Sequence, residues 1–148
     1  MKKVAIVYAS SHHHNTKKLV ENIALKCKID LFDVLYDNNI DLSNYDIVGF
    51  ASGIYMSTFH KSLFKFINVH NLPNKAFLIY TCGSGSKKYS ENIKSILVMK
   101  GINVLGIYSC RGFDTYGIWK FIGGIAKGHP TPNDILKGID FVNKIINN

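Results

Sequence analysis

The sequence contains little cysteine, proline and tryptophan, and it lacks any long hydrophobic run. Its three cysteines, Cys27, Cys82 and Cys110, lie far apart and form neither a CxxC pair nor a disulfide framework. No apolar run approaches the roughly 20 residues that cross a bilayer, and the first apolar run is too short for a signal peptide. These absences predict a protein of the reducing cytoplasm without stable membrane insertion.

Acidic residues are also scarce. Lysine and arginine number 18 against 10 aspartates and glutamates, so the net charge is +8 over 148 residues. Such a balance suggests nucleic acid, an anionic membrane surface or an acidic partner, but without a recognised motif or a basic–aromatic repeat we do not expect nucleic acid. The hydrophobic fraction of 47% predicts a packed core, and the length fits a single domain over residues 1–148.

Short apolar runs alternate with stretches of helical periodicity. The continuous runs at 3–9, 46–52, 75–80 and 103–109 are typical of strands covered on both faces, and a weaker run at 28–35 predicts an edge strand. Four apolar stripes predict helices: Leu19, Val20, Ile23, Ala24 and Cys27; Phe59, Leu63, Phe66 and Ile67; Ile93, Ile96 and Leu97; and Ile135, Leu136, Ile139, Val142, Ile145 and Ile146. Gly101 ends the third helix, and Thr131, Pro132 and Asp134 mark the start of the last.

The order of these elements, β-α-β-β-α-β-α-β-α, predicts an α/β fold. It favours a three-layer αβα sandwich around a five-stranded parallel sheet in the order 2-1-3-4-5. In this order a ligand binds at the carboxyl ends of the first, third and fourth strands, near the switch point.

Loops rich in hydroxyl groups or glycine follow all three of these strands: SSHHHNT at 10–16, SGIYMST at 52–58 and TCGSGS at 81–86. The first loop opens a helix, whose N-terminal N–H groups and dipole favour an anion. The hydroxyls of Ser10, Ser11 and Thr16 and the amide of Asn15 can donate to phosphate oxygens. The alternative is an ordinary capped turn. Since neither GxGxxG nor GxxxxGK[ST] is present, a mononucleotide fits better than a dinucleotide.

These segments resemble the flavodoxin family. The strand at 4–8, followed by a loop that ends Asn15-Thr16, is similar to the phosphate-loop signature T/S-x-T-G-x-T. Residues 45–55 resemble the third strand and first flavin loop of that family, 81–85 the second flavin loop, and 128–134 the segment before the last helix. The resemblance covers essentially the whole chain and implies non-covalently bound FMN.

The resemblance also implies a role for each loop. Tyr55 is the candidate to stack on the isoalloxazine, and Gly53 the candidate for a flexible peptide whose carbonyl meets flavin N5–H. The implied cofactor-binding residues are Ser10, Ser11, His13, Asn15 and Thr16 at the phosphate, with His14 close by; Ser52, Gly53, Ile54 and Tyr55 on one side of the ring; and Thr81, Cys82, Gly83 and Gly85 at the other side and its polar edge.

Histidine stands where the phosphate loop of the family usually has glycine. The run His12-His13-His14 must therefore accept a positive φ or take another turn. A metal site is not favoured, because adjacent loop residues rarely converge on one ion. A hydrogen-bonding or charged supplement to the phosphate is the better interpretation.

The basic charge is a second departure, since carrier flavodoxins are usually acidic. Five lysines and no carboxylate lie between Ile47 and Ser90. A basic rim around the flavin would steer acidic redox partners or anionic substrates, whereas the alternative is ordinary solvated lysines. The candidate rim comprises Lys61, Lys65, Lys75, Lys87, Lys88, Arg111, Lys120 and Lys127.

Three functions remain open. The first is an FMN-binding flavodoxin that transfers electrons at low potential between redox partners, with no catalytic residue of its own. The second is an FMN-dependent oxidoreductase of the quinone or protoporphyrinogen type. The loop at 51–55 with His60 and the basic, aromatic segment 110–130 resemble that branch, although its larger loop insertion is absent. The third is a binding module without flavin. The irregular segment 110–130 would form a lid, dock a partner, touch a membrane or pack on the sheet edge.

Overall fold

The computed structural model describes residues 1–11, 13–113 and 123–148. Its elements, in chain order, are β1 (Val4–Ala9), α1 (Asn15–Cys27), β2 (Asp30–Asp33), β3 (Ile47–Tyr55), β4 (Thr58–Phe59), α2 (Lys61–Val69), β5 (Lys75–Cys82), α3 (Glu91–Met99), β6 (Asn103–Arg111) and α4 (Pro132–Asn147).

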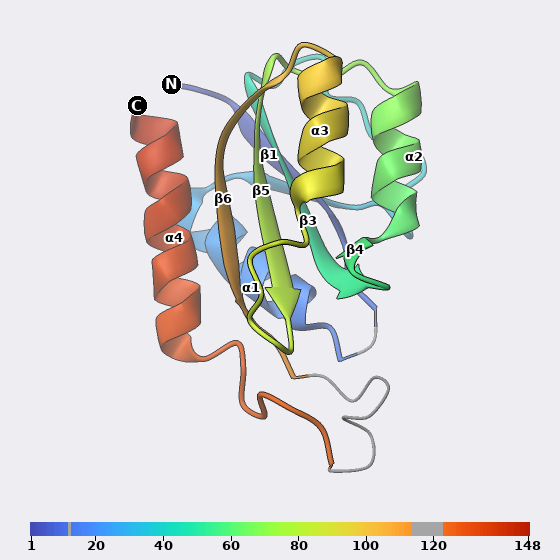
Figure 1. The fold of residues 1–148 in the computed structure, drawn as a ribbon. Coiled ribbons are helices and arrows are strands. Elements are labelled where there is room, and N and C mark those ends of the chain that lie inside the picture. The colour runs from blue at the N-terminus through green and yellow to red at the C-terminus, as the bar shows by residue number, and fades with distance from the viewer. Residues whose placement is uncertain (12, 114–122) are drawn as a thin grey trace.

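The five long strands form the predicted parallel sheet, in the order β2-β1-β3-β5-β6. Helices α2 and α3 cover one face and α1 and α4 the other, which confirms the three-layer αβα sandwich (Figure 1). The short strand β4 was not predicted. It pairs antiparallel with the end of β3, with Ile54 opposite Phe59 and Tyr55 opposite Thr58.

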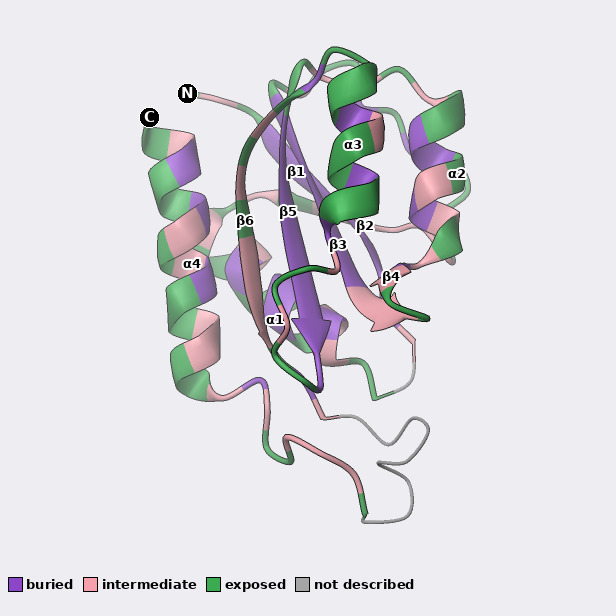
Figure 2. Cartoon of the chain, in the orientation of Figure 1, coloured by how far each residue is buried: buried purple, intermediate pink, exposed green. Residues whose placement is uncertain are grey.

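The core lies on both faces of the central strands (Figure 2). Every residue of β1 is buried, as its continuous apolar run predicts. Alternate side chains of β1 point to opposite faces, so Ala5 and Val7 pack toward α2 and α3, whereas Ile6 packs toward α1 and α4. Gly49 of β3 makes room for a ring of the neighbouring strand, since a Cβ there would lie 2.3 Å from Phe77.

The expectation that the run at 103–109 is covered on both faces was wrong. Strand β6 has a neighbour on one side only, and α4 packs against just one of its faces, where Gly106 and Tyr108 meet Phe141. Leu105 and Ile107 therefore remain 38% and 39% exposed. A continuous apolar run thus marks an edge strand here.

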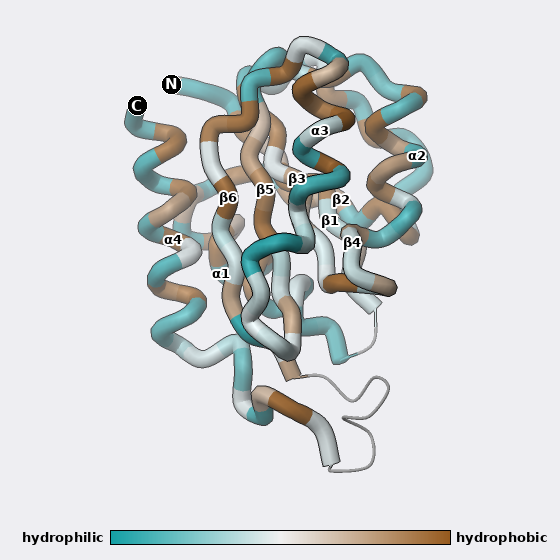
Figure 3. The backbone as a smooth tube through the Cα atoms, in the orientation of Figure 1, coloured by the Kyte–Doolittle hydropathy of each residue, from teal (hydrophilic) through white to brown (hydrophobic). Residues whose placement is uncertain are grey.

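The helix boundaries follow local signals. Thr131 and Asp134 form the expected capping box at the start of α4, whose sequence alternates between hydrophobic and hydrophilic residues (Figure 3). Gly101, at φ +78°, follows α3 as predicted. Phe59 belongs to β4 and not to the helical stripe, and His60 caps α2. None of the helices described is both long and apolar enough to cross a membrane.

Candidate functional site

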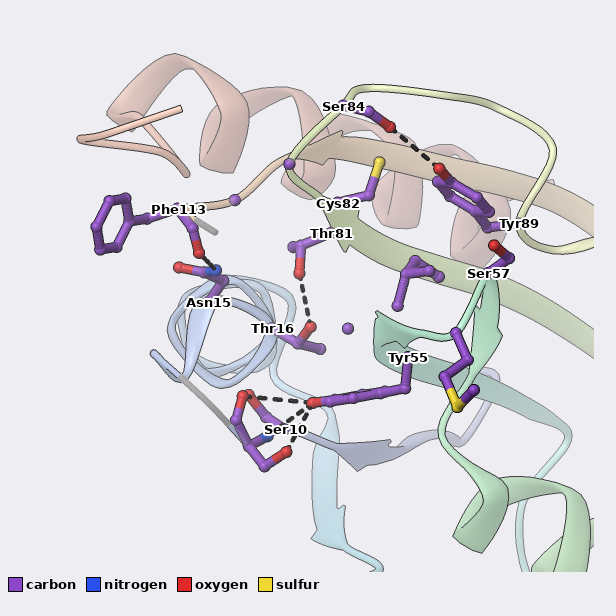
Figure 4. A pocket seen from close by; sticks show the side chains of 16 residues that line it. Ser10, Asn15, Thr16, Tyr55, Ser57, Thr81, Cys82, Ser84, Tyr89 and Phe113 are labelled. Carbon is purple, nitrogen blue, oxygen red and sulfur yellow. Dashed lines mark hydrogen bonds between the residues drawn. The ribbon is translucent and has the colours of Figure 1, made fainter. Parts of the chain in front are cut away.

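A cavity of about 650 Å³ lies at the carboxyl end of the sheet, where the switch-point argument expects a ligand (Figure 4). Its size is within the range of small-molecule sites, roughly 300–1,000 Å³. The loops after β1, β3 and β5 and the chain after β6 enclose it. The lining residues are Ser10, Ser11, Asn15, Thr16, Gly53, Ile54, Tyr55, Met56, Ser57, Thr81, Cys82, Gly83, Ser84, Tyr89, Gly112 and Phe113.

The loop between β1 and α1 forms one wall of the cavity. Ser10 Oγ accepts a hydrogen bond from the backbone N–H of Lys17 at 3.1 Å and so satisfies one of the free N–H groups in the first turn of α1. His13 and His14 adopt the left-handed conformation, with φ values of 70° and 52°. The histidines therefore accept the positive φ that glycine provides in the family pattern.

The chain after β6 closes against this loop. Asn15 Nδ2 donates to the Phe113 carbonyl oxygen at 2.7 Å, and the His13 and Phe113 rings lie 4.5 Å apart. Gly112 permits this approach, because a Cβ there would lie 2.7 Å from Asn15 Nδ2. Phe113 was not among the residues expected at the site. Within the irregular segment 110–130, residues 114–122 lie outside the described part of the chain.

The loop after β3 is a hairpin that presents apolar side chains to the cavity. Met56 and Ser57 are both left-handed, with φ values of 52° and 68°, as a type I′ turn requires. Such turns usually carry Asn-Gly, so the sequence gives no hairpin signal here. Met56 is 86% exposed at the tip, while Ile54 and Tyr55 line the cavity behind it.

Ser52 lies behind the cavity wall, and its side chain is fully buried. Its Oγ donates to the Gly53 carbonyl oxygen at 2.5 Å and accepts from the His60 backbone N–H at 2.9 Å. Burial, together with the charge of Lys61, lowers the pKa of His60. The Ser52 hydroxyl thus holds the Gly53 peptide in place.

Tyr55 lies across the cavity toward the loop after β1 (Figure 4). Its Oη accepts from the Ser11 backbone N–H at 2.9 Å and from Ser11 Oγ at 3.0 Å, and it donates to the Ser11 carbonyl at 3.3 Å. The ring passes over Gly53, where a Cβ would lie 3.1 Å from Tyr55 Oη. The Tyr55 ring also packs against the His60 ring, with the two ring centroids 5.0 Å apart.

The loop after β5 forms the remaining wall. Thr81 Oγ1 lies 2.9 Å from Thr16 Oγ1, and both side chains are buried. The Gly83 carbonyl accepts from Arg111 Nε at 3.1 Å, and Tyr89 Oη lies 3.2 Å from Ser84 Oγ. These contacts hold the loop over the cavity, where Ser84 and Tyr89 add polar groups.

The two nearby thiols are held neutral. Burial raises the pKa of Cys82, and it raises the pKa of Cys110 to about 12. A nucleophilic role needs the thiolate, so neither thiol is suited to it at neutral pH. Within residues 1–11, 13–113 and 123–148, no group of three or more histidine, cysteine or carboxylate side chains is arranged to hold a metal ion.

Most of the expected cofactor-binding residues border this one cavity, but four do not. His13 and His14 lie in the adjoining loop, Ser52 lies beneath the wall, and Gly85 lies beside the Arg111 side chain. Sequence reasoning did not single out Met56, Ser57, Ser84, Tyr89 and Phe113 as contact residues, although all of them except Tyr89 and Phe113 belong to the loops that it selected.

Four of the eight candidate rim residues are close in the sequence to the loops that form the cavity. Lys87 and Lys88 are exposed in the loop after β5, Lys61 is exposed at the start of α2, and Arg111 ends β6 beside Gly112. Lys75 begins β5 and so lies at the opposite edge of the sheet. Lys65 lies within α2 and Lys127 lies in the chain before α4, and both are exposed. Lys120 is outside the described residues. We use "basic rim" below for Lys61, Lys87, Lys88 and Arg111.

The fold and the site together define a flavodoxin-like protein. Residues 5–106 match the model of a family described as the flavodoxin domain. The chain therefore belongs to the flavodoxin family.

Several known proteins are similar to this chain. An uncharacterized protein of Methanocaldococcus jannaschii is 38% identical over 149 residues, which cover 99% of each chain. A solved flavodoxin from the domain Archaea has a TM-score of 0.63 at 16% identity, covering 96% of this chain and 98% of that one. A flavoprotein from Lactobacillus acidophilus, solved in complex with FMN, has a TM-score of 0.55 at 23% identity, covering 74% of this chain and 93% of that one. The two solved structures show the shared fold.

Proposed function

We propose that this protein binds FMN at the carboxyl end of its sheet and transfers electrons between redox partners. The observation that carries the proposal is the convergence, in one cavity, of a donor-rich loop at a helix N-terminus with apolar walls. The first suits a phosphate, and the second suits a flat ring system. The flavodoxin family and the solved FMN complex of a fold relative support a flavin as the occupant.

The residues present fit such a ligand. Ser10, Ser11 and Asn15 would bind the phosphate with the first N–H groups of α1. Ile54 and Met56 on one wall and Tyr89 on the other would contact the ring, and the backbone at Gly83 would lie near its polar edge. When bound, FMN supplies one- and two-electron redox chemistry. The chain supplies binding, orientation and exclusion of water.

The lining favours an electron carrier over an enzyme that also moves protons. Among the described residues that line the cavity there is no carboxylate, histidine, lysine or arginine, and the hydroxyls of Tyr55 and Tyr89 are engaged by Ser11 and Ser84. Cys82 is an unsuitable acid or base at neutral pH because burial raises its pKa. Transfer of electrons alone needs no such group, whereas many substrate reductions use a positioned acid.

We propose acidic proteins as the redox partners, because Lys87 and Lys88 are exposed in the loop after β5 that forms one cavity wall, and Lys61 is exposed at the start of α2. Exposed positive charges, together with an exposed apolar side chain such as Met56, suit a transient, electrostatically steered contact.

Stopped-flow spectroscopy of the FMN-loaded protein tests the proposed function. We expect fast oxidation and reduction by one-electron reagents such as ferricyanide and dithionite-reduced methyl viologen. We expect reduction by NADH or NADPH at no more than a small fraction of those rates. Rapid reduction by either nucleotide, with turnover of a quinone, would instead establish the oxidoreductase alternative.

A further inference from the structure

We infer that the Tyr55 hydroxyl occupies the position of a phosphate oxygen on the loop after β1, so that a phosphorylated ligand must displace it. This inference rests on the proposed FMN function. It makes Tyr55 a residue that sets the preference between FMN and unphosphorylated riboflavin, in addition to any contact of its ring with the flavin.

Two donors of Ser11 converge on the one tyrosine oxygen. The backbone N–H lies 2.9 Å and the side-chain hydroxyl 3.0 Å from Tyr55 Oη. A backbone N–H and a hydroxyl that meet at one acceptor are the donor set that phosphate oxygens use at helix N-terminal loops. Since Ser11 is part of the wall next to α1, Tyr55 Oη marks where an anion oxygen would sit.

The local structure of β3 allows this contact between residues 44 positions apart. Tyr55 and Gly53 point to the same face of the strand. The absence of a side chain at Gly53 lets the tyrosine lie back over the strand, with its hydroxyl oxygen 3.1 Å and its nearest ring atoms 3.4 Å from where a Cβ would be. The His60 ring packs edge-on against it at 5.0 Å. The type I′ turn at Met56 and Ser57 follows directly, so Tyr55 lies at the base of a short hairpin.

Competition for these donors has a measurable consequence. A phosphate oxygen cannot accept both Ser11 hydrogen bonds while Tyr55 Oη holds them. FMN binding therefore loses part of its affinity to the displacement, whereas riboflavin, which has no phosphate, leaves the contact in place. A net hydrogen bond is worth a factor of about 3 to 10 in affinity.

The test compares the wild-type protein with Tyr55→Phe, which removes the hydroxyl but keeps the ring. Flavin fluorescence quenching gives the Kd of FMN and of riboflavin for both. We expect Tyr55→Phe to bind FMN about 3- to 10-fold more tightly and riboflavin equally well. Tyr45→Phe is the control, because its hydroxyl bonds to Asp30 away from the cavity; it should change neither constant. An unchanged or weakened FMN affinity in Tyr55→Phe would overturn the inference.

A second measurement separates this inference from the proposed function. In the flavin-free protein, the Ser11 amide should exchange with solvent faster in Tyr55→Phe than in the wild type, and inorganic phosphate should bind the variant more tightly. Equal exchange and equal phosphate binding would refute the tyrosine–phosphate competition even if FMN binds. Faster exchange and tighter phosphate binding without any flavin affinity would support the competition and reject the FMN function.

Discussion

The hydroxyls of Thr16 and Thr81 lie 2.9 Å apart, and both side chains are buried. Thr16 is in the first turn of α1, which follows β1, and Thr81 is near the end of β5. In the sheet, β3 lies between β1 and β5. The bond therefore joins the donor-rich loop to the opposite wall of the cavity. It fixes the relative placement of the two walls that would hold the two ends of a flavin nucleotide.

Removing both hydroxyls of this pair should cost less than the sum of the two single removals. In Thr16→Val the buried Thr81 hydroxyl loses its partner, and in Thr81→Val the buried Thr16 hydroxyl loses its partner. Each should lower the free energy of unfolding by about 1–3 kcal/mol. The double variant should lose less than the sum of the two, because it leaves no unpaired hydroxyl. Urea denaturation of the four proteins measures this coupling, and strict additivity would show that the bond contributes nothing.

Ser52→Ala should affect both stability and the bound flavin. The change removes the acceptor of the His60 N–H and the donor to the Gly53 carbonyl. We expect a loss of about 1–3 kcal/mol in the free energy of unfolding. With FMN bound, the freed Gly53 carbonyl could accept from N5–H of reduced flavin, so the midpoint potential should rise. Ser62→Ala, which removes the hydroxyl that contacts His60 Nδ1 but leaves Ser52 in place, is the control in a potentiometric titration.

The start of α4 should depend on pH through Asp134. Burial raises the pKa of this carboxyl, but hydrogen bonds from Thr131 and His129 outweigh burial and leave it below its ordinary value of 3.8. A lowered folded-state pKa adds stability that is present above about pH 4 and is lost as the pH falls through the folded value. At pH 7, Asp134→Asn should therefore lower the free energy of unfolding by about 0.5–2 kcal/mol.

The difference between wild type and Asp134→Asn should shrink as the pH is lowered below about 4, since the wild-type carboxyl becomes protonated as the pH falls through its folded-state pKa. Thermal unfolding at a series of pH values tests this. A difference that stays constant down to about pH 2 would mean that the ionised carboxylate is not what stabilises the cap.

The basic rim should affect how the rates of oxidation by small charged oxidants depend on ionic strength. Oxidation of the reduced, FMN-loaded protein by anionic ferricyanide should slow as ionic strength rises, and oxidation by cationic hexaamminecobalt(III) should accelerate. The double variant Lys87→Glu/Lys88→Glu should flatten or invert both trends. Lys26→Glu/Lys144→Glu makes the same charge change in the last turns of α1 and α4. If both double variants behave alike, only net charge matters and the rim has no local role.

Much of the fold follows from patterns that are local in the sequence. The continuous apolar runs of β1 and β5 and the Thr131–Asp134 capping box each specify an element within a few residues. The doubly wound order then brings the ends of β1, β3 and β5 together, so the location of the cavity follows from topology alone.

The details of the cavity walls depend on contacts that the sequence does not encode locally. The Ser11–Tyr55 and Thr16–Thr81 bonds join residues 44 and 65 positions apart, and each needs a particular side-chain conformation. The sequence does not reveal the hairpin after β3, because its two turn residues are Met56 and Ser57 instead of the usual Asn-Gly. Both adopt a positive φ without being glycine. Phe59 is apolar and lies at helical spacing from Leu63, so the sequence pattern places it in α2, although it belongs to the short strand β4.

The central claim is that the cavity binds FMN through its phosphate. The most direct measurement is a fluorescence-quenching titration of the flavin-free protein with FMN and, in parallel, with riboflavin. The account predicts an FMN Kd in the micromolar range or tighter and a riboflavin Kd at least about tenfold weaker, which corresponds to about 1.4 kcal/mol for the phosphate. No quenching of FMN at micromolar concentration, or equal affinity for the two flavins, would contradict it.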